Sequence, residues 1–190
     1  MFILASASAR RQMLLERFPH PFSIEPASME ESSFGGTAAC VVSGLAFEKA
    51  REVWSHHPEE VVVGVDTVVV HEGRVLGKPK DAEEAKEMLR TLSGSTHEVL
   101  TGYAIIGPKH RMVNVVTTKV TFRELTDEEI FAYVETKEPM DKAGSYGIQG
   151  LGSLFIERIE GDYEAVVGLP TSALAQDLKE SFGIDLLKGV

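Results

Sequence analysis

The chain has 190 residues, 43% hydrophobic and 25% charged, which is enough to bury a sizeable core in one domain or two closely joined lobes. With 19 Lys and Arg against 29 Asp and Glu, its formal net charge is −10, which argues against nucleic acid or an anionic membrane as a partner. The single cysteine, Cys40, excludes an internal disulfide, and with no apolar run of membrane-spanning length it predicts a cytoplasmic protein.

The predicted elements alternate between strands and helices along the chain. Short apolar runs predict strands over 2–5 and 22–25, a long β-branched run predicts a central strand over 61–70, and helical spacing predicts helices over 9–18 and 37–54. Further on we predict a helix over 82–92 capped by Asp81, and strands over 96–106, 112–122 and 154–159. We also predict a helix that begins at Thr126, with Glu129 placed for a capping box, and a last helix over 170–182. Residues 161–170 read as a turn, a strand and a helix start. The alternation predicts either an α/β fold with a mixed sheet or a mixed α+β fold.

Asp66 is the most informative residue, because the nine other positions of the run 61–70 are apolar, β-branched or Gly. A carboxylate in a buried strand is costly unless a charged or donating group meets it. The candidate cations lie beside turn signals or on an apolar helix face, and they are Arg10, Arg11, Lys49, Lys78 and Lys142. Either Asp66 caps a turn or pairs with one cation in the core, or it belongs to a site for a metal ion and a phosphorylated ligand.

The segment 6–11 joins the first strand to the first helix. Ser8 is a candidate N-cap, and the N–H groups that follow it, with Ser6, suit a phosphate. Arg10 and Arg11 are unfavourable against the helix dipole in a first turn, which makes sense if an anion sits there. The alternative is an exposed basic pair on an amphipathic helix.

Three lysines and a glycine-rich segment are further candidates. Lys49 lies on the apolar stripe of its helix, so it either extends out of the core or points into a polar cleft. Lys78, in the Gly-Lys-Pro turn 77–79, can reach a phosphate or lie on the surface. In the segment 141–150, which contains Lys142, three glycines allow a close backbone approach to a ligand, Tyr146 offers a stacking surface and Gln149 offers a donor and an acceptor for a base edge.

An acidic loop at 29–36 adds Glu30 and Glu31. A hard divalent cation takes oxygen ligands, and Mg²⁺ commonly uses one or two carboxylates together with substrate phosphates. Asp66 and Glu31 can supply them, although a solvated acidic loop is the alternative. The histidines form no metal-binding pattern, which argues against zinc.

Together these segments resemble the Maf family of nucleoside triphosphate pyrophosphatases. The resemblance covers residues 6–11, 30–31, 48–50, 64–67, 77–79, 141–150 and 167–170, in the family's order. It implies one domain over residues 1–190, with a two-lobed α/β fold like that of inosine triphosphate pyrophosphatases and the active site in the cleft between the lobes. It further implies cleavage between the α- and β-phosphates, which gives a nucleoside monophosphate and pyrophosphate. A homodimer rests on the resemblance alone.

The resemblance also implies roles for single residues. Asp66 matches the catalytic proton acceptor, and Arg10, Thr67 and Gln149 match positions linked to base preference. Thr67 and Gln149 look like the branch that prefers dTTP and UTP, whereas the 7-methyl-GTP branch carries Gln and Glu there. The expected metal is Mg²⁺ or Mn²⁺ at Asp66 and Glu31. Phosphate contacts are expected from Ser6, Ser8, Arg11, Lys49, Lys78 and Lys142.

Two departures from the family pattern are visible, Ala9 where Pro is usual and Glu30 where Asp is common. Other functions also stay open. One is a 7-methyl-GTP or damaged-nucleotide pyrophosphatase, and another is a nucleotidyl or sugar-phosphate transferase. A third is a nucleotide-binding module without turnover, because the family has been associated with septum inhibition and cell division arrest as well as with house-cleaning of nucleotides.

Overall fold

The sheet dominates the structure, a computed structural model that describes residues 1–28 and 35–189. Its strands are β1 (Phe2–Ala5), β2 (Phe22–Ile24), β3 (Val61–His71), β4 (Arg74–Leu76), β5 (Thr96–Ile106), β6 (Arg111–Phe122) and β7 (Ile156–Glu160). The described residues form a seven-stranded sheet in the order β2-β1-β3-β5-β6-β7, with β4 paired to β3. β1 runs parallel to β2 and β3, whereas β4 and β7 pair antiparallel with β3 and β6, which confirms the predicted mixed α/β class.

The helices are α1 (Ala9–Leu15), α2 (Ala38–His56), α3 (Ala82–Leu92), α4 (Asp127–Glu135), α5 (Tyr163–Val167) and α6 (Thr171–Phe182), with short 3₁₀ turns η1 (Glu138–Asp141), η2 (Ala143–Ser145) and η3 (Leu151–Phe155). The chain divides into two compact units. Unit 1 holds Met1–Asp66, Thr101–Val116 and Gly168–Val190, and unit 2 holds Thr67–Leu100 and Thr117–Val167. Among the described residues, no helix is both long and apolar enough to cross a membrane.

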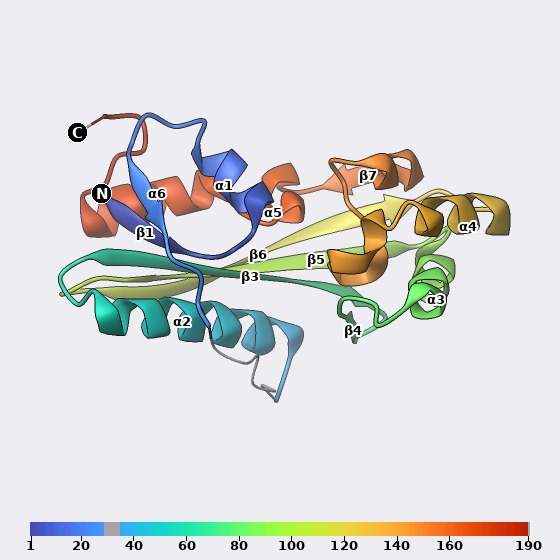
Figure 1. The fold of residues 1–190 in the computed structure, drawn as a ribbon, viewed down its shortest axis with the longest axis horizontal. Helices are drawn as coiled ribbons and strands as arrows, with labels where there is room; N and C mark the ends of the chain where they lie inside the picture. Colours follow the sequence, from blue (N-terminus) through green and yellow to red (C-terminus); the bar gives the residue numbers. More distant parts are fainter. Residues whose placement is uncertain (29–34, 190) are drawn as a thin grey trace. The chain divides into compact units, whose positions relative to one another are not determined.

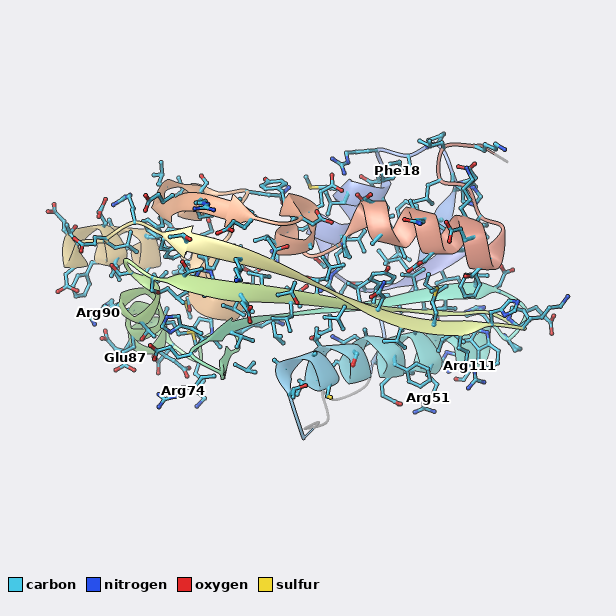
Figure 2. The ribbon with its side chains drawn as sticks, turned by 180° about the vertical axis from the view of Figure 1, so that it is seen from behind. Phe18, Arg51, Arg74, Glu87, Arg90 and Arg111 are labelled. Atoms are coloured by element: carbon cyan, nitrogen blue, oxygen red, sulfur yellow. The ribbon has the colours of Figure 1, made fainter. Side chains whose placement is uncertain are left out.

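In unit 1, α2 covers one face of the strands and α1 and α6 lie on the other (Figure 1). The core between α2 and the sheet is built largely from small and β-branched side chains: Ile3, Ala5, Ala46, Ala50, Val53, Val62, Ala104 and Ile106. Figure 2 shows charged Arg51 on the outer side of α2, away from this core. The small residues of the inner face let the α2 backbone lie close to the strands.

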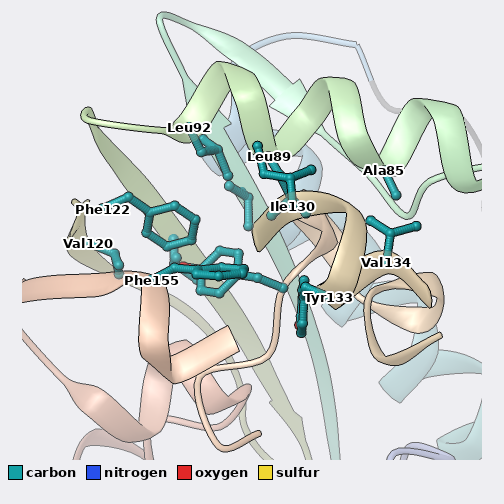
Figure 3. Close-up of a cluster of buried hydrophobic side chains, with 12 residues drawn as sticks. Ala85, Leu89, Leu92, Val120, Phe122, Ile130, Tyr133, Val134 and Phe155 are labelled. Carbon is teal, nitrogen blue, oxygen red and sulfur yellow. The ribbon is translucent and has the colours of Figure 1, made fainter. Parts of the chain in front are cut away.

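Unit 2 has its own core, in which α3 and α4 pack together through Leu89 and Ile130 and the Tyr133 ring meets Phe155 edge-on at 4.9 Å (Figure 3). Both helices begin at the predicted caps. The Asp81 side chain accepts from the backbone N–H of Glu84, and Thr126 with Glu129 forms the predicted capping box. Each satisfies N–H groups that a helix start leaves without partners.

Two local predictions were wrong, and some short elements were not predicted. Helix α1 ends at Leu15 and not at residue 18, since Pro19 disfavours a helical backbone before it. The predicted strand within 161–170 is helix α5, because the Asp162 carboxylate accepts from the backbone N–H groups of Glu164 and Ala165 at 2.8 and 3.2 Å. The three-residue strand β4 and the short 3₁₀ turns η2 and η3 were not predicted.

Candidate active site

Gly64 brings helix α2 directly against strand β3. A Cβ atom at Gly64 would overlap the Ala46 carbonyl oxygen and would lie 2.6 Å from the backbone nitrogen of Ala50. Gly102 on β5 also lets α2 approach the sheet closely, since a Cβ there would come within 2.9 Å of the Val42 carbonyl oxygen. With hydrogen as the only substituent at both positions, helix and sheet meet backbone to backbone.

Asp66 lies two residues after Gly64, so strand alternation turns its side chain to the same face of β3, toward α2. On α2, Lys49 lies between Ala46 and Ala50, the two residues that contact Gly64. The Lys49 ammonium donates to Asp66 Oδ1 at 2.6 Å, and the two side chains are only 16% and 11% exposed. The cation that the buried carboxylate was expected to meet is therefore Lys49, which points inward and does not extend out of the core.

Arg11 donates hydrogen bonds that fix the segment following β1. The register pairs Ala5 with Gly64, so the chain leaves β1 at Ser6 within two residues of the Asp66 position along the strands. Ser6 is 8% exposed, and its hydroxyl oxygen accepts from Arg11 Nη1 at 3.0 Å and from the Ser8 N–H at 3.3 Å. Arg11 Nε also donates to the Gly168 carbonyl at 2.8 Å, which links α1 to the start of the C-terminal segment.

Ser8 stands at the predicted N-cap with an extended backbone, but its side chain makes no capping hydrogen bond to the described residues. The cap of α1 thus differs from those of α2, α3 and α4, where the N-cap side chain accepts from the first turn. Arg10 follows in that first turn and is half-buried.

In unit 2, the irregular segment 77–79 lies beside the glycine-rich segment. The Gly144 N–H donates to the Gly77 carbonyl at 3.1 Å, while Lys78 is exposed. Lys142 is half-buried, and its ammonium donates to Asp141 Oδ1 and to the Glu138 carbonyl, both at 2.6 Å. The structure therefore joins the two segments that carry Lys78 and Lys142.

The glycines of this segment face protein atoms, which corrects the expectation that they make room for a ligand. A Cβ at Gly144 would meet the Val69 side chain at 3.0 Å, one at Gly147 would lie 2.7 Å from Lys142 Cε, and one at Gly150 would run into the Glu138 carboxylate. Gly144 also has a φ of 69°, in the left-handed region.

Tyr146 is 6% exposed, so its ring offers no open stacking surface, contrary to expectation. It packs edge-on against Phe122 and His97, with ring centroids 4.7 and 5.4 Å away, and its hydroxyl lies 2.8 Å from His97 Nε2. Burial lowers the pKa of His97 to about 4, with a smaller contribution from the charge of His71. Neutral His97 therefore fixes Tyr146 inside unit 2.

The two residues expected to read the base differ in exposure. Gln149 is exposed, whereas Thr67 is half-buried and, as the neighbour of Asp66 on β3, faces the opposite side of the strand. Of the predicted site residues, unit 1 holds Ser6, Ser8, Arg10, Arg11, Lys49 and Asp66, and unit 2 holds Thr67, Lys78, Lys142 and Gln149.

A divalent cation at this site would need oxygen donors. Asp66 supplies a carboxylate, the type of ligand that Mg²⁺ and Mn²⁺ take, and its side chain is 11% exposed. Glu30 and the predicted second ligand Glu31 lie outside the described residues. Within the described part of the chain, no group of three or more His, Cys, Asp or Glu side chains is placed to hold a metal ion. This donor set fits a cation that takes its remaining ligands from substrate phosphates and water.

Several residues that shape the site were not singled out from the sequence. Gly64 carried a usable signal, since an isolated glycine inside a strand often marks a close backbone approach. Glu138 and Tyr133, which bind the backbone of residues 147–152, carried none, because their partners lie 13 or more residues further along the chain.

Comparisons with known proteins cover nearly the whole chain. A family model described as "Maf-like protein" matches residues 1–181. A protein of Bacillus cytotoxicus named dTTP/UTP pyrophosphatase is 51% identical over 180 residues, which are 94% of each chain. One of Bacillus cereus with the same name is 51% identical over 185 residues, 97% of this chain and 96% of that protein. The solved structure of the Staphylococcus aureus Ham1 protein aligns with a TM-score of 0.44 and 16% identity over 66% of this chain and 72% of that one.

Proposed function

The chain belongs to the Maf family, and from that premise we propose that it hydrolyses dTTP and UTP to the nucleoside monophosphate and pyrophosphate. The observation that carries the proposal is the 51% identity, over nearly the full length of both chains, to relatives named dTTP/UTP pyrophosphatase. The small-molecule substrate is a nucleoside triphosphate, and the enzyme is a hydrolase.

Asp66 is the proposed catalytic residue. Its carboxylate takes the proton of the attacking water, or orients that water, as the α-phosphorus is attacked. Two features support this role: Asp66 lies on the central strand β3, and the Lys49 ammonium donates a hydrogen bond to its carboxylate at 2.6 Å, which fixes the direction of the side chain. Lys49 is also close enough to this carboxylate to hold a phosphate oxygen beside the attacking water.

The triphosphate carries several negative charges, which the chain must balance locally because its net charge is −10. We assign this task to Arg11, Lys49, Lys78 and Lys142, together with Ser6 and Ser8 at the start of α1. The Arg11 guanidinium is already oriented by Ser6 and Gly168, and a guanidinium matches phosphate geometry with its planar array of donors.

A divalent cation, Mg²⁺ or Mn²⁺, held by Asp66 and Glu31, would supply further charge neutralisation for the phosphates and polarise the attacking water. Base preference is assigned to Arg10, Thr67 and Gln149. The amide of Gln149 presents both a donor and an acceptor, which matches the uracil or thymine edge, and its exposure leaves it accessible to a ligand.

The test is to incubate the purified protein with dTTP, UTP, CTP, the purine triphosphates and 7-methyl-GTP, with Mg²⁺, with Mn²⁺ or with a chelator. We expect monophosphate plus pyrophosphate, fastest with dTTP and UTP and abolished by the chelator. Release of orthophosphate would mean that a different bond is cut. Pyrophosphate that forms only when an acceptor is added would indicate a transferase, and tight binding without product would indicate a nucleotide-binding module.

A further inference from the structure

The Glu138 side chain binds the backbone of the glycine-rich segment. Its Oε2 accepts from the Leu151 N–H at 3.0 Å, and its Oε1 accepts from the Gly152 N–H at 3.2 Å. Oε1 also accepts from the Tyr133 hydroxyl at 2.9 Å. Both carboxylate oxygens are therefore occupied by N–H or O–H donors, and two of these donors belong to the first turn of η3.

Tyr133 extends this contact to the other end of the same segment. Its hydroxyl accepts from the Gly147 N–H at 3.1 Å while it donates to Glu138. Within the segment, the Gly150 N–H donates to the Gly147 carbonyl at 3.3 Å and closes a turn. We call Glu138 and Tyr133 the anchor pair. They hold residues 147 and 151–152, and Gln149 lies between these fixed points.

Beside the anchor pair, Gly150 and Gly152 have no space for a side chain. A Cβ at Gly150 would overlap the Glu138 carboxylate, and one at Gly152 would lie 2.8 Å from the Tyr133 hydroxyl. Glycine at these positions therefore lets the backbone approach the anchor pair closely enough for its N–H groups to bond.

The charge of Glu138 suits this arrangement. Burial opposes that charge, but the N–H groups of Leu151 and Gly152 and the Tyr133 hydroxyl outweigh it and hold the pKa of Glu138 below its usual value. The side chain is thus an ionised acceptor near neutral pH, and hydrogen bonds to a charged acceptor are stronger than those between neutral groups.

We propose that Glu138 and Tyr133 are positioning residues for base selection, because they fix the backbone that presents Gln149 to the nucleotide. The inference rests on the proposed function, in which Gln149 reads the base. It adds two residues that need not touch the substrate and act through the conformation of residues 147–152.

Glu138→Gln is the sharpest test, since it preserves the size of the side chain. A carboxylate has two acceptor oxygens, whereas an amide has one acceptor and one NH₂ donor. Whichever way the amide turns, its NH₂ group faces the N–H of Leu151 or of Gly152. Tyr133→Phe is the second variant, because it removes only the hydroxyl that binds Gly147 and Glu138.

Each variant has a matched control in a different hydrogen-bond network. Glu129→Gln changes a carboxylate that also accepts a backbone N–H at a helix start, from Thr126 at 2.9 Å, without contacting residues 147–152. Tyr103→Phe removes a buried hydroxyl that donates to the Asp177 carboxylate at 2.5 Å. Urea unfolding of all four variants shows how much stability each change costs.

The measurement is kcat and KM for UTP and for CTP in the wild type and the four variants. For Glu138→Gln and Tyr133→Phe we expect the ratio of kcat/KM for UTP over CTP to fall about tenfold, which corresponds to about 1.4 kcal/mol, mostly through a higher KM for UTP. Glu129→Gln and Tyr103→Phe should keep the wild-type ratio even where they lower stability. If Glu138→Gln fails to fold, Tyr133→Phe carries the test.

An unchanged UTP/CTP ratio in the anchor-pair variants, with wild-type activity on UTP intact, would overturn this inference and leave the proposed function standing. Equal losses of discrimination in anchor-pair and control variants would also overturn it, since general destabilisation would then explain the effect. A wild-type protein that hydrolyses no pyrimidine triphosphate would overturn the proposed function itself, and the inference with it.

Discussion

The Lys49 ammonium lies 2.6 Å from Asp66 Oδ1, and the elements that carry the two residues touch through Gly64 and Ala46. A lysine on an apolar helix stripe and an aspartate in an apolar strand are each unfavourable alone. Together they form a hydrogen-bonded ion pair, so each charge offsets the cost of burying the other. Such a pair places a carboxylate and an ammonium side by side in unit 1, where substrate chemistry is proposed to occur.

Asp66→Asn should lower kcat for dTTP by about 100-fold or more, because an amide cannot accept a proton from water. The fold should survive, since the Asn oxygen can still accept from Lys49. Steady-state rates and circular dichroism check both points. Asp127→Asn, which alters an exposed carboxylate paired with Arg90, is the matched control and should retain wild-type activity. Substantial turnover by Asp66→Asn would remove this residue from the catalytic role.

Lys49→Met should destabilise the protein by about 1–3 kcal/mol, because it leaves the Asp66 carboxylate mostly buried without its ammonium partner. Combining it with Asp66→Asn should restore part of this loss, with an interaction free energy of about 1 kcal/mol. Urea unfolding of the two single variants and the double variant measures it. Arg51→Met, which breaks a surface pair on the outer side of the same helix, should cost little. Strict additivity would show that the pair contributes nothing to stability.

Replacing Thr67 with Gln and Gln149 with Glu should shift base preference from dTTP and UTP toward 7-methyl-GTP. At position 149 a neutral amide becomes a carboxylate, which only accepts hydrogen bonds and attracts a cationic base. Relative kcat/KM values for the three nucleotides, with each single variant measured beside the double, separate the two contributions. An unchanged preference in the double variant would contradict the assignment of both residues.

Stability should fall as the pH is lowered from about 6.5 to 4.5. The pKa of His97 is lowered to about 4 in the folded chain, against about 6.5 for an unperturbed histidine. In this window the unfolded chain binds a proton that the folded chain does not, so the free energy of unfolding decreases by about 2 kcal/mol with falling pH. Urea unfolding at both pH values tests this.

His97→Gln can keep a hydrogen bond to Tyr146 but cannot titrate, so the pH dependence of its unfolding should be smaller by that amount. His110→Gln, at an exposed position, should retain the full pH dependence. If all three proteins lose the same stability on acidification, the loss comes from groups other than His97.

Prediction from sequence succeeded where a local rule decides the structure. Helix α3 has the predicted bounds because Asp81 caps it and its apolar spacing is regular, and α4 begins with its capping box. Prediction failed for α5, because its Tyr and Val residues favour a strand, whereas in the structure the Asp162 side chain binds two N–H groups at the start of a helix.

Contacts between distant residues were harder to predict. The sequence named Lys49 among five candidate cations for Asp66 but could not select it, because the choice depends on how closely α2 approaches β3. The anchoring role of Glu138 was equally hidden, since backbone N–H groups leave no mark in a sequence. Only the glycines that admit these contacts are visible in it.

The contact at Gly64 sets the distance between α2 and β3, and this distance decides how long a cationic side chain on α2 must be to reach Asp66. If evolution placed alanine or a larger residue at this strand position, α2 would have to move outward, because a Cβ there would overlap the Ala46 carbonyl oxygen. The ammonium of Lys49 would then lie further from the carboxylate than 2.6 Å, and the longer side chain of arginine would compensate for a larger shift. In relatives of this chain, the size of the residue two places before the aspartate should therefore vary together with the length of the cationic side chain on the facing helix.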